Sequence, residues 1–227
     1  MSPTLSQKFA NDFNEQAQCP LFNRTPPEIR NHIFHLTLRS YYDKLAGPYP
    51  SETYFTRPEY RYPQRIDTNL LSTCRKVYLE AHLVPILVNE HVFWCYRGPP
   101  KSIADPKAYF KRMTDEQRTA VEKVHFFAQM YWLEGSFPTV CALKEMKNLG
   151  RASKGPKSLK ITIRHSDWWF WERNMRLRIQ QHWGNMLVKL KGLEELELEL
   201  ETIERDKDQV CPLFSTDRSV SLMAHGS

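Results

Sequence analysis

A pattern of apolar residues recurs through the second half of the chain at nearly constant spacing, and it constrains the fold more than any other feature. Its three copies read Val121-x-x-Val124-x-Phe126, Pro156-x-x-Leu159-x-Ile161-x-Ile163 and Leu193-x-x-Leu196-x-Leu198-x-Leu200. The centres at 126, 161 and 198 lie 35 and 37 residues apart, and Phe93 precedes the first by 33. Such alternation is typical of strands, and the stretches between them can each hold a helix. The sequence therefore predicts a parallel sheet backed by helices, an α/β body similar in layout to a short, irregular leucine-rich-repeat array.

This body is expected to span residues 98–208. Short helical turns are predicted over 106–113 and 114–120, the second with Thr114 and Gln117 as a capping box. Residues 121–132, 157–164 and 193–201 are predicted strands, and in the last of them leucine faces the core while glutamate faces solvent. Longer helices are predicted over 137–149, ending at Gly150, and over 171–190. Residues 91–96, rich in β-forming side chains, supply the first strand.

The front of the chain, residues 19–97, begins with a predicted amphipathic helix. Thr25 is expected to cap it, Pro26 to take its first position and Glu28 to complete a capping box. An apolar stripe follows at i, i+4 and i+7, formed by Ile29, Ile33 and Leu36. One side of this helix therefore needs a cover, which is either the chain's own core or a partner.

A second amphipathic helix is predicted after Asp67 or Thr68, and Pro85 bends or ends it. Its apolar face is formed by Leu70, Leu71, Cys74, Val77, Tyr78 and Ala81. Between the two helices, residues 43–67 hold several prolines among tyrosine and phenylalanine residues. This composition favours an extended, partly packed insertion.

These segments resemble a known family. Thr25-Pro26-Pro27-Glu28-Ile29-Arg30-Asn31-His32-Ile33-Phe34 is similar to the Leu-Pro-Pro-Glu-Ile-Arg-x-x-Ile-[Tyr/Phe] helix of the F-box-like proteins of filamentous fungi. Leu70-Leu71-Ser72-Thr73-Cys74-Arg75-Lys76-Val77-Tyr78-Leu79-Glu80-Ala81 matches that family's Leu-Leu-x-Thr-Cys-Arg-x-x-Tyr-x-Glu-Ala stretch, and Val92-Phe93-Trp94 matches the aromatic strand that follows. The resemblance covers the first hundred residues in the expected order, whereas the body shares only the general layout.

The resemblance implies an adaptor. F-box helices dock on the Skp subunit of a cullin-RING ubiquitin ligase, and the rest of such a chain selects an unknown target protein. Carried over to this sequence, the residues that would face the Skp-type subunit, or else the core, are Pro26, Pro27, Ile29, Ile33, Leu36, Leu70, Leu71 and Val77.

The charge of the body changes sign along the chain. Residues 144–191 hold twelve Lys/Arg against three Asp/Glu, and residues 192–208 hold two against eight. An aromatic cluster at residues 168–171 lies in the basic part, where it serves either as core or as a recognition patch that could stack on bases. The target-binding candidates on this body are Lys160, Arg164, Trp168, Trp169, Arg173, Glu195, Glu197 and Glu199.

A search for chemistry finds no catalytic motif, so we expect neither an enzyme nor a cofactor. The sequence has no phosphate-binding loop and no nucleophile elbow, and its five cysteines are scattered without a C-x-x-C pair. His32 and His35 lie three apart on one helix, but no local ligand completes a metal site. The polar start and the lack of a long apolar run predict neither export nor a membrane span, and hence a cytoplasmic or nuclear protein.

We therefore expect a protein-interaction adaptor with flexible ends, residues 1–18 and 209–227. One alternative is a nucleic-acid-binding protein that uses residues 144–191. A second alternative is an enzyme of secondary metabolism whose site the sequence does not reveal.

Overall fold

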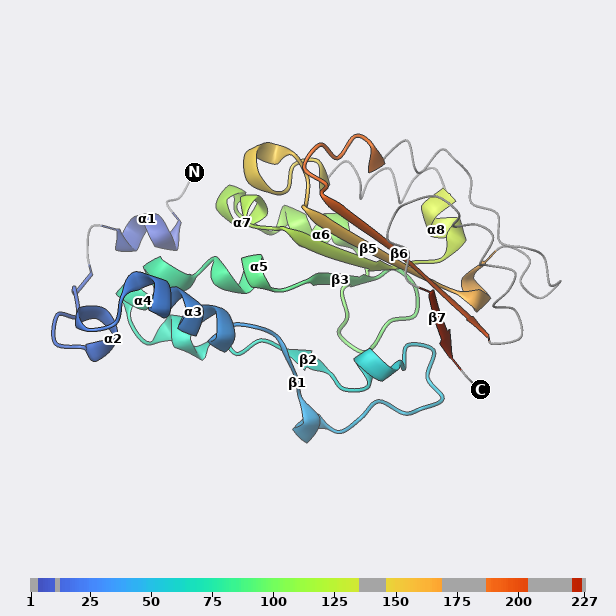
Figure 1. Cartoon of the computed structure of the whole chain (residues 1–227), viewed down its shortest axis with the longest axis horizontal. Helices are drawn as coiled ribbons and strands as arrows, with labels where there is room; N and C mark the ends of the chain where they lie inside the picture. The colour runs from blue at the N-terminus through green and yellow to red at the C-terminus, as the bar shows by residue number, and fades with distance from the viewer. Residues whose placement is uncertain (1–3, 11–12, 135–145, 169–186, 204–221, 226–227) are drawn as a thin grey trace. The chain divides into compact units, whose positions relative to one another are not determined.

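The chain forms two compact units, Met1–Asn89 and Glu90–Ser227 (Figure 1). The computed structural model describes residues 4–10, 13–134, 146–168, 187–203 and 222–225. The boundary lies earlier than the predicted division after residue 97, because β3 (His91–Trp94) pairs with the sheet of the second unit. The chain thus combines helices and strands, with a helical first unit and a mixed α/β second unit.

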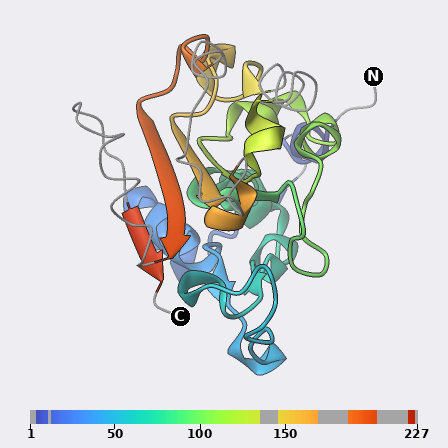
Figure 2. The same cartoon turned by 90° about the vertical axis from the view of Figure 1, so that its right-hand side faces the viewer.

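The second unit is built on a five-stranded parallel sheet. Its order is β3-β4-β5-β6-β7, and the arrows of β6 and β7 point the same way in Figure 2. The strands after β3 are β4 (Lys123–Phe127), β5 (Ser158–Arg164), β6 (Glu195–Ile203) and β7 (Leu222–His225). Phe93 lies opposite Phe126, which lies opposite Ile161, which in turn lies opposite Leu198. The predicted parallel arrangement and its register are confirmed, while β7 falls in a tail that was predicted to be flexible.

Three short helices accompany the sheet, namely α6 (Pro106–Lys111), α7 (Asp115–Thr119) and α8 (Met130–Glu134). Two of them, α6 and α8, contact it through aromatic side chains. The ring of Phe93 lies 5.2 Å from that of Phe110 in α6, and the ring of Phe126 lies 5.1 Å from that of Trp132 in α8. The capping box of Thr114 and Gln117 is present, as predicted.

Some predicted elements of the second unit are shorter than expected or lie outside the described residues. The strand predicted over 121–132 is confined to β4, because Met130 begins α8 and is completely buried. An apolar run of this length fits both the two-residue period of a strand and the 3.6-residue period of a helix. Periodicity alone therefore could not distinguish a strand from a helix here. The helices predicted over 137–149 and 171–190 lie outside the described residues except at their ends. Two 3₁₀ turns, η4 (Arg151–Ser153) and η5 (His165–Asp167), flank β5.

The described part of the first unit holds five α-helices and a short 3₁₀ turn that leads into the fourth of them. They are α1 (Leu5–Phe9), α2 (Pro20–Asn23), α3 (Pro27–Thr37), η3 (Asn69–Ser72), α4 (Arg75–Ala81) and α5 (Val84–Val88). The buried core residues are Phe34, Leu38, Val77, Ala81 and Val84. The start of the chain forms α1, which has its own capping box, and the Phe9 ring lies 5.4 Å from that of Tyr78 in α4.

The insertion at 43–67 is more ordered than an extended loop. Antiparallel strands β1 (Tyr41–Tyr42) and β2 (Gln64–Arg65) form a ribbon at its base, and two 3₁₀ turns, η1 (Lys44–Ala46) and η2 (Pro58–Tyr60), lie within it. The buried Asp43 carboxylate accepts hydrogen bonds from the Leu45 and Ala46 amides and pairs with Arg65 at 3.1 Å. This carboxylate holds the ribbon and the first turn together, which the proline-rich composition did not predict.

Both residues at the junction of the units are bonded into their own unit. The buried Asn89 amide donates to the carbonyls of Leu38 (2.9 Å) and Pro85 (2.7 Å) and accepts from the Ser40 amide (2.6 Å). Glu90, the next residue, bonds to His125 of β4.

Among the described helices, none combines the length and the apolar character that a membrane crossing requires.

The turn that leads into β5 depends on two glycines in the left-handed region, Gly150 (φ +70°) and Gly155 (φ +97°). A Cβ at Gly150 would lie 2.1 Å from the Gly155 carbonyl oxygen, whereas one at Gly155 would meet only the Leu190 side chain, at 3.3 Å and beyond, and the Met146 carbonyl oxygen at 3.6 Å. We predict that Gly155→Ala costs the strain of a non-glycine residue, about 1–3 kcal/mol. Gly150→Ala adds a backbone clash and should cost clearly more in urea unfolding. Equal losses for the two variants would contradict this assignment.

Candidate functional site

The first predicted helix begins one residue later than expected. α3 starts at Pro27 with Pro26 as its N-cap residue, and no side chain caps it. The Thr25 hydroxyl donates instead to the Pro20 carbonyl of α2, at 3.3 Å. The predicted capping box is therefore wrong, because Thr25 is turned toward the preceding helix and cannot accept from the amides of α3.

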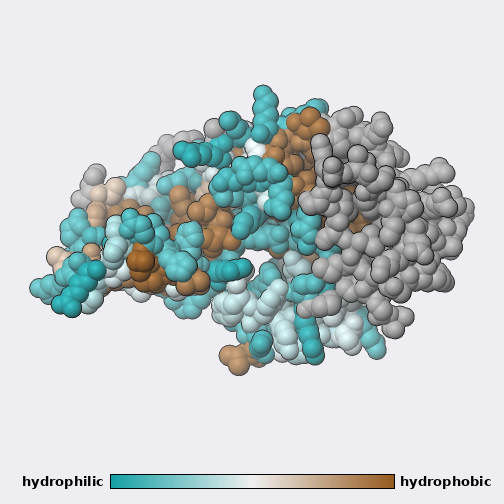
Figure 3. Space-filling model, viewed as in Figure 1, coloured by the Kyte–Doolittle hydropathy of each residue, from teal (hydrophilic) through white to brown (hydrophobic). Residues whose placement is uncertain are grey.

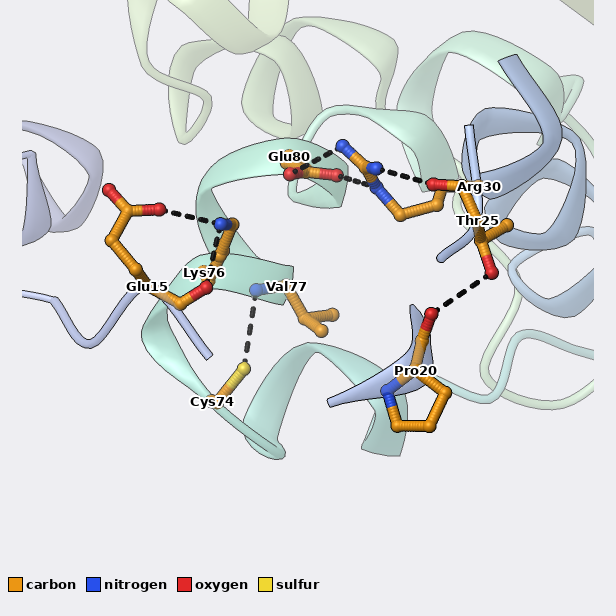
Figure 4. A network of polar contacts seen from close by, with 8 residues as sticks. All are labelled: Glu15, Pro20, Thr25, Arg30, Cys74, Lys76, Val77 and Glu80. Carbon is orange, nitrogen blue, oxygen red and sulfur yellow. Dashed lines mark hydrogen bonds and ion pairs between the residues drawn. The ribbon is translucent and has the colours of Figure 1, made fainter. Parts of the chain in front are cut away.

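Arg30 and Glu80 join α3 to α4 through a two-pronged ion pair (Figure 4). Nε of Arg30 donates to Oε2 of Glu80 at 2.9 Å, and Nη2 donates to Oε1 at 3.1 Å. Nη1 donates to the Thr25 carbonyl at 2.9 Å. Both side chains are largely buried, so this geometry combines two charge-assisted bonds with little screening by water. The two sequence motifs thus meet through one charged residue of each, a contact that sequence analysis missed although both residues belong to the matched patterns.

A second set of contacts ties α2 and the preceding segment to α4. The Arg30 guanidinium lies 5.5 Å and the Lys76 ammonium 4.9 Å from the centre of the Phe22 ring. Lys76 also pairs with Glu15 at 2.7 Å, as Figure 4 shows. These contacts hold α2 and the segment before it against α4, next to the side of α3 that carries Arg30.

With α3 held in this orientation, its predicted apolar stripe faces outward. Phe34 and Leu38 are completely buried, whereas Ile29, Ile33 and Leu36 are 53%, 38% and 63% exposed. In the space-filling view, apolar atoms reach the surface over the helices of the first unit (Figure 3). The stripe is therefore not part of the core, and it forms a surface that a partner could cover. We call Ile29, Ile33 and Leu36 the α3 stripe.

The other predicted docking residues are not equivalent to the stripe. Val77 is buried, and Leu70 and Leu71 are partly buried against the core, so these three stabilise the unit from within. Pro26 and Pro27 are exposed at the start of α3. Of the eight candidates, five therefore remain on the surface: Pro26, Pro27, Ile29, Ile33 and Leu36.

The second predicted helix is interrupted. η3 ends at Ser72, and α4 begins after Cys74, whose backbone is extended (φ −159°, ψ 160°). The Cys74 sulfur accepts a hydrogen bond from the Val77 amide at 3.5 Å and so caps α4 (Figure 4). The prediction of a single continuous helix was wrong, because this cap starts a new helix at Arg75. Leu70 and Leu71 therefore pack against the core from η3 and not from α4.

In the second unit, the charged face of the sheet was predicted to be open, but its side chains pair with one another. Lys160 of β5 lies 3.1 Å from both Glu197 and Glu199 of β6, and Arg164 lies 3.5 Å from Glu201. Glu199 and Glu201 are buried, which corrects the expectation that the glutamates of β6 face solvent. The pairs follow the strand register, in which Lys160 lies opposite Glu197 and Arg164 opposite Glu201. Of the predicted target-binding residues on β5 and β6, Lys160, Arg164, Glu197 and Glu199 therefore form ion pairs that stabilise the sheet. Glu195 is exposed.

A chain of buried hydrogen bonds crosses the same face. The Thr162 hydroxyl donates to Glu199 at 2.6 Å and lies within hydrogen-bond distance of Nε2 of His125, at 2.8 Å. Nδ1 of His125 lies 3.1 Å from the Glu90 carboxylate, which accepts. His125 thus links the Glu90 carboxylate to the Thr162 hydroxyl, which in turn is bonded to Glu199.

Both carboxylates remain ionised despite their burial. Burial alone would raise the pKa of Glu199, but bonds from Thr162 and Lys160 and the nearby positive charges hold that pKa below its ordinary value. Burial likewise acts to raise the pKa of Glu90, and the hydrogen bond and charge of His125 lower it overall. Thr162, His125 and Glu199 form a cross-strand network that is satisfied internally.

The order Thr162, His125, Glu90 resembles the hydroxyl, imidazole and carboxylate of a nucleophilic triad, but the arrangement does not suit catalysis. Thr162 and His125 are each only 1% exposed, so a substrate has no access to the hydroxyl. The Thr162 hydroxyl donates its proton to Glu199 and not to the imidazole, so His125 is not placed to take that proton as a general base. We therefore assign these residues to the stability of the sheet.

The remaining candidates offer no second site among the described residues. Trp168 is buried, in agreement with a core role, while Trp169 and Arg173 lie outside the described residues. Burial and the charge of Asp105 raise the pKa of the Cys95 thiol, so it is not a reactive thiolate. No group of His, Cys, Asp and Glu in the described part of the chain could hold a metal ion.

Comparison with known proteins found no match among family models, curated proteins or solved structures. The α3 stripe is the feature of the described surface that most clearly points to a binding function.

The Arg30–Glu80 pair should stabilise the first unit measurably. Glu80→Gln removes the charge and weakens both bonds, and we expect it to lower the free energy of unfolding by about 1.5–3 kcal/mol. Glu52→Gln, at an exposed position of the same unit, is the matched control and should change little. Chemical denaturation of both variants checks this, and a loss no larger than that of the control would show that the pair contributes nothing.

The buried carboxylates predict acid sensitivity of the second unit. A carboxylate whose pKa is lowered by folding stabilises the folded state above its unfolded pKa, and this contribution is lost as the pH falls through the lower folded pKa. Unfolding free energy should thus fall as the pH drops below the ordinary value of 4.5 for Glu199. Glu199→Gln should be less stable at neutral pH and lose less on acidification, whereas the exposed Glu195→Gln should follow the unaltered chain. Identical pH profiles for all three would contradict the network.

Proposed function

We propose that the first unit is an F-box-like docking module, and that the chain is an adaptor that links a target protein to the Skp-type subunit of a cullin-RING ubiquitin ligase. The observation that carries the proposal is the exposed α3 stripe on a helix whose opposite side is anchored in the core.

The stripe has the spacing of a helix that binds in a groove. Anchors at i, i+4 and i+7 lie along one side of a helix and are read as a unit by a hydrophobic groove. Burying an aliphatic side chain of this size gains about 1.5–3 kcal/mol. Leaving three of them in water on a well-anchored helix is therefore unfavourable for an isolated chain and favourable for one that binds a partner.

The resemblance to F-box-like proteins supports the choice of partner. The residues that carry the resemblance include Arg30 and Glu80, and these two form the pair that sets the orientation of α3. The same orientation exposes Ile29 and Ile33, which the resemblance places against either the Skp-type subunit or the core. The same ion pair between the two sequence motifs thus also sets which apolar side chains of α3 face outward.

The second unit would select the target. Its parallel strands, in register through Phe93, Phe126, Ile161 and Leu198, support a helix-backed, leucine-rich-repeat-like body. Such a body offers a rigid surface to a protein partner, and an adaptor of this kind would act in the cytoplasm or nucleus.

Docking can be tested by co-purification with a Skp-type subunit. Ile33→Asp places a charge in the middle of the α3 stripe and should weaken association by more than about thirtyfold, the effect of a hot-spot residue. Leu45→Asp makes the same kind of change at a fully exposed leucine of η1 and should leave association unchanged. Circular dichroism confirms that both variants fold. Association of folded Ile33→Asp at the strength of the unaltered chain would refute the proposal.

A further inference from the structure

We infer that the side of α4 formed by Arg75, Lys76 and Tyr78, which we call the α4 face, is a peptide-binding site that the chain's own N-terminal segment occupies. Residues 4–10 and 13–16 form this segment, which we call the strap. The site takes a peptide that presents an aromatic ring and a carboxylate, and a partner with such a segment competes with the strap. The inference goes beyond the proposed docking of the α3 stripe and does not depend on it.

The α4 face lies on the side of the helix that points away from the core. Val77 and Ala81 of α4 are buried in the core of the first unit. Because successive residues of an α-helix are turned by about 100°, Arg75 falls on the opposite side, with Lys76 and Tyr78 to its left and right. These three side chains are therefore placed to bind a segment that lies on the outside of α4.

The strap contacts this face through one ring and one carboxylate. The Phe9 ring meets the Tyr78 ring edge-on, with 5.4 Å between the ring centres, and the Arg75 guanidinium lies 5.2 Å from the centre of the Phe9 ring. The Lys76 ammonium donates to the Glu15 carboxylate at 2.7 Å and to the Glu15 carbonyl at 2.8 Å, as Figure 4 shows. The α4 face thus holds an aromatic residue and an acidic residue that are six positions apart.

The strap is attached to the outside of the unit and is not built into its core. No residue of α1 is buried, and Leu5 is 52% exposed. The helix is instead stabilised locally, by the capping box of Thr4 and Gln7. The next helix differs, because its Leu21 and Phe22 pack against the buried cluster. A segment with its own local structure and no buried anchor can leave without opening the core, as a bound peptide does.

The charge of the α4 face favours an acidic ligand. Arg75 and Lys76 both belong to it, whereas Glu80, the one acidic residue of α4, is bonded to Arg30. Cations of this kind bind an aromatic ring through its face and a carboxylate through charge-assisted hydrogen bonds. A ligand that combines both groups therefore matches the α4 face better than a basic or purely aliphatic one.

The tether makes the strap an effective occupant although its contacts are weak. Exposed ion pairs and cation–ring contacts each contribute little by themselves. A short tether, however, gives the attached segment an effective concentration on the order of millimolar. A separate peptide therefore binds well only when the strap has been released.

The test measures the binding of a dye-labelled synthetic peptide with the sequence of residues 4–16 by fluorescence anisotropy. Its host is the full chain with Phe9→Ser and Glu15→Gln, which remove both contacts of the strap; this variant is called the released chain. We expect the released chain to bind the peptide at least about tenfold more tightly than the unaltered chain does.

Matched variants locate the contacts. A peptide with Phe9→Ala should bind the released chain about tenfold more weakly, whereas a peptide with Leu5→Ser, at an exposed position, should bind like the parent peptide. Within the released chain, Arg75→Gln should weaken binding about threefold. Arg39→Gln, at an exposed arginine of the same unit, should leave it unchanged.

The outcomes separate this inference from the proposed function. A folded released chain that does not bind the peptide, or that binds the Phe9→Ala peptide equally well, would overturn the inference, as would equal binding by the unaltered chain. If circular dichroism shows that the released chain no longer folds, the strap is part of the structural framework and the inference is wrong as well. Ile33→Asp in the released chain should keep full peptide binding, whether or not the α3 stripe docks on a Skp-type subunit.

Discussion

The bidentate ion pair between Arg30 and Glu80 determines how α3 and α4 of the first unit are held together. A guanidinium is planar and rigid, so two parallel bonds to a carboxylate fix direction as well as distance. Because Arg30 also holds the Thr25 carbonyl, α3 cannot rotate about its axis without breaking three bonds at once. This fixed rotation buries Phe34 of α3 and the C-cap residue Leu38, and it turns the α3 stripe outward. An aliphatic residue in place of Arg30 could fill the same space, but it would not select one rotation of the helix.

The sheet of the second unit uses a different principle, in which charged positions are neutralised across neighbouring strands. In a parallel sheet, side chains in register point to the same face, so a base on β5 and an acid on β6 meet directly. Lys160 opposite Glu197 and Arg164 opposite Glu201 follow this rule. Next to them, Thr162 and His125 extend the polar contacts toward β4. A strand that alternates leucine and glutamate can thus have both of its faces covered, which makes the register of the strands more specific than apolar packing alone would.

Sequence analysis predicted the features that depend on periodicity and missed those that depend on a distant partner. Apolar spacing located β4, β5 and β6 and their register through Phe126, Ile161 and Leu198, because each strand buries the same kind of face. The outward position of the α3 stripe could not be predicted, since a stripe has the same pattern whether core or partner covers it. Thr25 was assigned the wrong bond because Pro20, its actual acceptor, lies in a neighbouring helix. The burial of Glu199 follows from Thr162 and Lys160, which lie far away in the sequence.

The two residues at the junction, Asn89 and Glu90, have a consequence for how the protein can be divided. Each is bonded into its own unit: Asn89 bonds to Leu38 and Ser40, just after α3, and to Pro85 of α5, and Glu90 bonds to His125. No residue therefore separates the last one anchored in the first unit from the first one anchored in the second. Truncated proteins that end at Asn89 or begin at Glu90 would keep all of these bonds, whereas a cut a few residues to either side would strip one fragment of its terminal anchor.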